Sequence, residues 1–143
     1  MKKLDDLLVV AIREWVEKAE NDLKACRQLL RAGSDAPTDV VCYHAQQCVE
    51  KYMKAALVTA AIDFPKTHDI AVLFRMLPKR SRPSLAADQC RRLTRYATAT
   101  RYPGSYPVIS LTEARQAVGL ARVVRRELRV LLPGKSLVKR LDL

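Results

Sequence analysis

Apolar side chains recur every three or four residues along most of this chain, which is the spacing of amphipathic helices. The first such stretch predicts a helix that begins at about residue 7 or 12 and ends near residue 31, before Gly33. The next stretch predicts a helix that Thr38 or Asp39 caps and that ends at about Ile62. Because this second helix is apolar over more than one face, we expect it to lie centrally among the others.

Three shorter helices are predicted in the rest of the chain, each after a residue that can cap it. The expected caps are Thr67, Ser84 and Ser110, and the last of these forms a capping box with Glu113. The predicted helices cover residues 69–77, residues 84 to 98 or 100, and residues 110–131. The fold class expected is therefore all-α, an up-and-down four-helix-type bundle with about five helices.

Length and composition agree with a single helical domain. The chain has 143 residues, and we place the domain at residues 1–132, followed by a basic, flexible tail at residues 133–143. No apolar run approaches the roughly 18–20 residues of a membrane span. The apolar stretch near the start is too short for the core of a signal peptide, so we expect a cytoplasmic protein.

The cysteines and glycines exclude several common kinds of site. The four cysteines lack CxxC spacing and fall within helical patterns, which favours buried thiols over metal ligands: Cys26, Cys42, Cys48 and Cys90. The chain has 4 glycines and no Gly-rich phosphate loop, which argues against the common nucleotide-binding folds. No metal site and no resident cofactor is expected.

Positive charge is concentrated in the second half of the chain. The formal net charge is +11, yet residues 1–74 carry 10 basic and 11 acidic side chains. Residues 75–143 carry 16 basic and 4 acidic side chains, and arginine dominates. Arginine matches phosphate geometry and stacks on bases, so this half is expected to attract polyanions. A solvated basic surface that serves solubility is the alternative.

Several polar residues interrupt the apolar pattern of the second predicted helix. On a helical wheel Gln47, Lys51 and Lys54 share one stripe with His44, while Gln46 and Glu50 lie on a neighbouring stripe. Two interpretations stay open. These residues form either a solvated edge with local ion pairs, such as Glu50 with Lys54 at i+4, or an internal polar network that lines a groove.

Two further clusters carry candidate chemistry. His68 follows Thr67 at the start of the third predicted helix, where it can bind an anion, act as an acid or base, or simply pack. The stretch from Arg95 to Tyr106 interleaves arginine and tyrosine, including Arg101 and Tyr102. Such residues can hold phosphates and stack bases, although Tyr96 can equally belong to the core.

Read in order, these segments resemble the HEPN domain family over about residues 10–132. The segments are AENDLKA from Ala19, HAQQCVEKYMKA from His44, KTHDI from Lys66, and Arg95-Tyr96 with Arg101-Tyr102-Pro103. The resemblance implies an all-α bundle, commonly a homodimer, that binds a nucleotide such as ATP, or RNA. It also implies a small nucleotidyltransferase protein as partner, with many such pairs acting as toxin and antitoxin.

The resemblance identifies residues at the family's binding positions, but it identifies none at the catalytic positions. The expected groove residues are Gln47, Glu50, Lys51, Lys54, His68, Arg101 and Tyr102. Some family members are metal-independent ribonucleases with an R-x(4–6)-H motif, and here neither histidine follows an arginine at that spacing. No catalytic residue is therefore assigned. A ribonuclease toxin with an atypical active site and a non-catalytic dimeric docking protein are the alternatives to a nucleotide-binding module.

Overall fold

The computed structural model describes residues 2–98, 102–104 and 107–138, with side chains from residue 5 onwards. Within these residues all regular structure is helical and strands are absent, so the all-α bundle is confirmed. The α-helices are α1 (Lys2–Leu30), α2 (Thr38–Thr59), α3 (Ile70–Met76), α4 (Ala87–Thr98) and α5 (Leu111–Arg129). Short 3₁₀ helices follow at η1 (Gly33–Asp35), η2 (Lys79–Ser81) and η4 (Gly134–Leu137).

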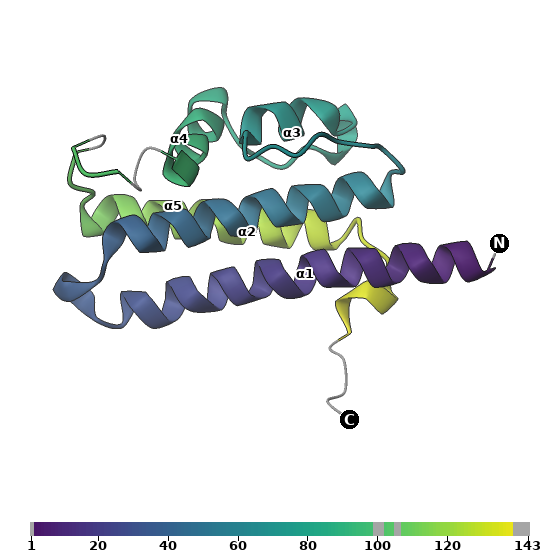
Figure 1. Cartoon of the computed structure of the whole chain (residues 1–143), viewed down its shortest axis with the longest axis horizontal. Helices are drawn as coiled ribbons and strands as arrows, with labels where there is room; N and C mark the ends of the chain where they lie inside the picture. Colours follow the sequence, from purple (N-terminus) through teal and green to yellow (C-terminus); the bar gives the residue numbers. More distant parts are fainter. Residues whose placement is uncertain (1, 99–101, 105–106, 139–143) are drawn as a thin grey trace.

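Helix α2 lies at the centre of the bundle (Figure 1), as its apolar pattern predicts. Helices α1 and α5 pack along it, while α3 and α4 cover the side away from α1. Small residues such as Ala45 on α2 and Ala117 on α5 are buried, which lets helices approach closely. The four cysteines are buried free thiols within this core, as expected.

The start of α2 differs from the prediction. Neither Thr38 nor Asp39 caps the helix, because the N-cap position is Pro37, which provides no side-chain hydrogen bond. The Thr38 hydroxyl instead donates to the carbonyl oxygen of Ile109, at 2.7 Å, and ties this end of α2 to the segment before α5. Asp39 lies in the first turn, where its charge still favours the helix dipole.

The end of α2 falls three residues before the predicted Ile62. Ala61 takes a left-handed conformation, with φ at 57°, and the amide of Ile62 donates back to the carbonyl of Leu57. With the amide of Ala61 donating to the carbonyl of Val58, this is a Schellman ending. Glycine usually occupies such a position, so the sequence offers no glycine signal for the end of this helix.

Helix α4 also begins later than predicted. Ser84 does not cap it, because the Ser84 amide and hydroxyl both donate to the Glu127 carboxylate of α5. The helix begins at Ala87, and the Gln89 side chain accepts from the amide of Ala86. At α5 the predicted cap is confirmed, since the Ser110 hydroxyl oxygen accepts from the amide of Glu113.

The segment after α5 includes the short helix η4, within the range 133–143 for which the sequence predicts a flexible tail. Helix η4 packs on α1, next to the middle of that helix (Figure 1). The Arg13 guanidinium donates to the carbonyl oxygen of Lys135, Ser136 is buried, and Leu137 packs against the core. Residues 139–143 of the predicted tail lie outside the described residues.

Candidate functional site

The polar residues of α2 form an internal network rather than a solvated edge. The side chains of four residues in the most polar stretch of the helix are buried, with at most 8% of each residue exposed: Gln46, Gln47, Glu50 and Lys54. Polar groups buried to this degree need partners, since each unpaired group costs roughly 1–3 kcal/mol. Each of these side chains makes a hydrogen bond within the network. The burial therefore decides between the two interpretations that the helical spacing left open.

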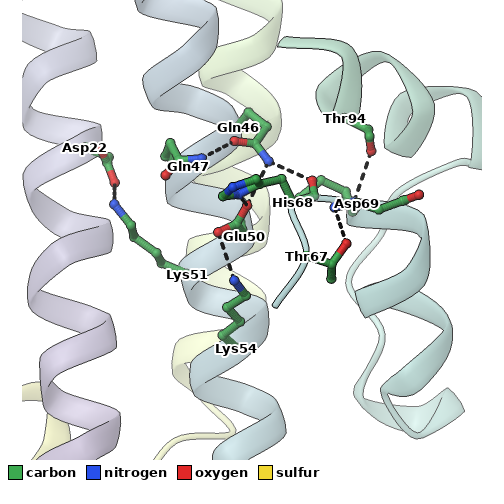
Figure 2. Close-up of polar contacts among 11 residues, drawn as sticks. Asp22, Gln46, Gln47, Glu50, Lys51, Lys54, Thr67, His68, Asp69 and Thr94 are labelled. Atoms are coloured by element: carbon green, nitrogen blue, oxygen red, sulfur yellow. Dashed lines mark hydrogen bonds and ion pairs between the residues drawn. The ribbon is translucent and has the colours of Figure 1, made fainter. Parts of the chain in front are cut away.

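Glu50 is the hub of this network (Figure 2). Its Oε1 atom accepts from Gln46 Nε2 at 3.2 Å and lies 2.7 Å from His68 Nδ1, while Oε2 accepts from Lys54 Nζ at 3.1 Å. Gln46 Nε2 also donates to the carbonyl oxygen of His68, and Gln46 Oε1 accepts from Gln47 Nε2. The predicted residues Gln47, Glu50, Lys54 and His68 thus form one connected unit that joins α2 to the chain before α3.

Local backbone contacts hold His68 in this place. The Thr67 hydroxyl oxygen accepts from the amide of Asp69, and the Asp69 carboxylate accepts from the amides of Ala71 and Val72. Asp69, not Thr67, is therefore the N-cap of α3. The hydroxyl of Thr94 on α4 accepts from the amide of Ile70, which ties the start of α3 to α4 (Figure 2).

Lys54, one of the expected groove residues, points inward. Its ammonium group contacts the Glu50 carboxylate and lies over the rings of Trp15 and Phe64, at 5.4 Å and 5.8 Å from the ring centroids. With 8% of the side chain exposed, the charge is already neutralised and screened from solvent. Lys54 therefore stabilises the network, and a ligand would have to displace Glu50 to reach it.

Lys51 belongs to a separate cluster on the α1 side of α2. Its ammonium group donates to one oxygen of Asp22 on α1, and the other oxygen lies 2.8 Å from His44 Nδ1. Figure 2 shows Lys51 directed toward α1, away from Glu50 and His68. Lys51 therefore lies outside the Glu50 network, because the step of one residue from Glu50 turns its side chain about 100° around the helix, toward α1.

The residues of the third predicted cluster lie in different surroundings. Arg101 lies outside the described residues, and Tyr102 is 66% exposed. Tyr96 belongs to the core, where its hydroxyl donates to the Glu113 carboxylate at 2.8 Å. The proposed stacking and phosphate roles of Tyr102 and Arg101 stay predictions.

A hollow next to Asp69 contains three arginines of α4, of which the sequence analysis singled out only Arg95. It lies between the start of α3 and α4 and has a volume of about 510 Å³, within the usual range of ligand pockets. Its lining comprises Asp69, Ala71, Asp88, Arg91, Arg92, Thr94 and Arg95. The signal was present in the sequence as arginines spaced i, i+1 and i+4 on the solvent face of α4. We call this site the α3–α4 hollow.

A second polar cluster joins α1 to α5. The Glu20 carboxylate accepts from Nε and Nη2 of Arg125, at 2.9 Å and 2.7 Å, and Arg129 donates to Glu20 and to the hydroxyl of Tyr52. Burial acts to raise the pKa of Glu20, but hydrogen bonds and the two guanidinium charges outweigh it, so that the pKa of Glu20 lies below the ordinary value of a glutamate. The same burial raises the pKa of the Tyr52 hydroxyl.

The cysteine thiols are chemically quiet in this fold. Burial raises the pKa of Cys26 and of Cys42 to about 12, and it raises the pKa of Cys48 and Cys90 as well. A thiol reacts and binds metals as the thiolate, so these cysteines act as apolar core residues. Among the described residues, no group of three or more histidine, cysteine or acidic side chains could hold a metal ion.

The comparisons agree with the fold and the motifs. Residues 12–131 match the model of the HEPN domain family, and the chain therefore belongs to that family. The described helices include none that is long and apolar enough to span a membrane.

Known relatives match different shares of the chain. A Methanocaldococcus jannaschii protein named "Putative toxin MJ1304" is 39% identical over 61 residues, which are 43% of this chain and 38% of that protein. The crystal structure of TT1696 from Thermus thermophilus superposes with a TM-score of 0.70 at 25% identity, covering 85% of this chain and 98% of TT1696. The crystal structure of ST0689, an archaeal HEPN homologue, superposes with a TM-score of 0.61 at 23% identity, covering 84% of this chain and 97% of ST0689.

Proposed function

We propose that this protein is a nucleotide-binding HEPN module that acts with a small nucleotidyltransferase partner in a toxin–antitoxin pair. Membership of the HEPN domain family and the name of the M. jannaschii relative support the toxin–antitoxin role. The partner follows from the family resemblance. A homodimer is part of the same proposal.

One observation carries the nucleotide-binding part of the proposal, namely the α3–α4 hollow next to the Glu50 network. Arg91, Arg92 and Arg95 line it, and the guanidinium group suits bidentate contacts with phosphate oxygens. The exposed Asp88 carboxylate supplies an acceptor for ribose hydroxyl or base amino groups. This mixture of charges fits a mononucleotide such as ATP better than a uniform polyphosphate chain. Asp69 belongs to the lining as well, and His68 precedes it in the chain.

Isothermal titration calorimetry with ATP and AMP tests the proposal. Replacing Arg91 and Arg92 together by alanine removes two phosphate ligands, and we expect the dissociation constant for ATP to rise at least tenfold, which is about 1.4 kcal/mol. The double change Lys79→Ala, Arg80→Ala on η2 removes the same charge outside the hollow and should leave binding within about twofold. Absence of saturable binding by the unchanged protein, or equal affinity of both double variants, would contradict the proposal.

A metal-independent ribonuclease is the second candidate, and the geometry of His68 favours it. Because a carboxylate accepts, His68 Nδ1–H is the donor to Glu50, which leaves Nε2 of the neutral ring as an acceptor. The His68 side chain is 62% exposed, so its imidazole is positioned by Glu50 and still faces solvent, as a general base requires.

RNA incubated in EDTA distinguishes the two candidates. A ribonuclease of this kind cleaves without metal, loses cleavage in His68→Ala, and keeps it in His44→Ala, whose ring contacts Asp22 in the other cluster. An unchanged protein that leaves RNA intact over many hours would reject the ribonuclease and leave the binding module standing.

A further inference from the structure

A long cationic groove runs along the face where α1, α5 and η4 meet. Two adjoining hollows form it, with volumes of about 370 Å³ and 500 Å³, and they share Arg27, Arg125 and Arg129. We call this surface the α1–α5 groove. It has no lining residue in common with the α3–α4 hollow, which lies on other helices.

The lining of the α1–α5 groove is strongly basic. It contains two carboxylates, Glu17 and Glu20, against six cationic side chains: Lys24, Arg27, Arg122, Arg125, Arg126 and Arg129. Arg27, Arg122 and Arg126 are exposed. Within the part of the chain that the structure describes, these three arginines make no ion pair or hydrogen bond, so their donors face solvent. A surface of this kind attracts an anionic partner.

Glu20 shows how this surface binds a carboxylate. Arg125 donates two parallel hydrogen bonds to the Glu20 carboxylate, which is the bidentate geometry by which arginine recognises carboxylates. The lowered pKa of Glu20 reflects the same stabilisation of a negative charge. Arg122 and Arg126 project from the same helix one turn apart and can hold further carboxylates in the same way.

Apolar side chains border these arginines. Val138 lines one end of the groove and is 64% exposed, while Val130, next to Arg129 in the chain, is 80% exposed and Leu131 is 41% exposed. Exposed aliphatic side chains gain free energy by burial against other apolar groups, which a sugar–phosphate backbone does not offer. The combination of arginine forks and aliphatic side chains is the composition of protein–protein interfaces.

We propose that the α1–α5 groove docks an acidic segment of a partner protein, with aspartate or glutamate side chains bound by Arg27, Arg122 and Arg126 and with apolar residues packed on Val130 and Val138. Charge complementarity orients the segment and speeds its association, and the aliphatic contacts slow its release. The proposal does not depend on nucleotide binding, because the two sites share neither residues nor helices.

Fluorescence anisotropy with a labelled peptide of alternating glutamate and leucine tests this docking surface. We expect saturable binding to the full chain that weakens as salt rises. The double change Arg122→Glu, Arg126→Glu should weaken it at least tenfold, because both side chains are exposed and lack partners that their loss would disturb. The control Lys79→Glu, Arg80→Glu on η2 alters the net charge equally and should change the affinity by less than threefold.

Three outcomes would overturn the proposal. The first is that the peptide with glutamine in place of glutamate binds equally well, and the second is that the peptide does not bind saturably. The third is that a single-stranded RNA of the same length and label binds more tightly than the peptide and loses its affinity in Arg122→Glu, Arg126→Glu, which would make the groove a nucleic-acid surface. Circular dichroism of both double variants checks that their helices are intact.

Discussion

Glu50 shows how one buried carboxylate organises several polar residues. With its side chain 4% exposed, it contacts an ammonium group, an imidazole ring and an amide at once. An ion pair so far from water stabilises the fold little in total, because desolvation offsets the attraction. Removing one partner alone is costly, however, because the other charge stays buried and unpaired.

We expect Glu50→Ala to lower the free energy of unfolding by about 3–5 kcal/mol, because Lys54 keeps a buried charge and His68 loses its acceptor. Urea denaturation measures this change. The double variant Glu50→Gln, Lys54→Met removes both charges at nearly constant volume and should cost less than half as much. If the double variant is as unstable as Glu50→Ala, the unpaired charge is not the cause.

At the scale of the element, the sequence predicts where most of the second helix lies but does not signal where it ends. Its apolar periodicity indicates a central helix, and α2 indeed contacts every other α-helix. Its Schellman ending places Ala61 in the left-handed region, where the β-carbon of alanine costs roughly 1 kcal/mol that glycine avoids.

Ala61→Gly should therefore raise the free energy of unfolding by about 0.5–1 kcal/mol, measured by urea denaturation. The same change one residue earlier, Ala60→Gly, is the control, because φ there is −82° and glycine relieves no strain. We expect that control to be neutral or destabilising. A gain in stability from Ala60→Gly equal to that from Ala61→Gly would argue against the left-handed conformation as the source.

At the scale of the whole molecule, the segment after α5 completes one side of the bundle. Helix η4 covers α1 through a buried Ser136, a packed Leu137 and a hydrogen bond from Arg13. The same segment forms one end of the α1–α5 groove, where Leu137 and Val138 line the wall. The boundary expected at residue 132 thus divides a unit that packs together.

A chain shortened to residues 1–132 should lose about 1–3 kcal/mol of stability, because the packing of Leu137 on the core is lost and Arg13 loses its acceptor. Thermal and urea unfolding measure the loss. A chain that ends at residue 138 keeps the contacts of η4 given above and should be more stable than the chain that ends at residue 132. Equal stability of the two shortened chains would mean that η4 contributes no packing energy.

Periodicity and local turn chemistry determined much of this molecule from sequence alone. The helical class, the central place of residues 38–59 and the buried cysteines were predictable from the apolar pattern, and the cap at Ser110 from an interaction within one turn. Local sequence also predicted helix caps at Thr38, Thr67 and Ser84, and none of these residues caps a helix. In each case the side chain or its neighbour found another partner, and for Thr38 and Ser84 that partner lies more than 40 residues away.

Only the tertiary structure decided which polar residues act together. Spacing on one helix placed Lys51 with Gln47 and Lys54, but packing against α1 on one side and α3 on the other separates Lys51 from the Glu50 network. Likewise, only the structure shows that the arginines of α4 and α5 line hollows formed with neighbouring helices. The sequence determined the faces of each helix, since these depend on local geometry. The structure decided what each face meets, since that depends on contacts between distant parts of the chain.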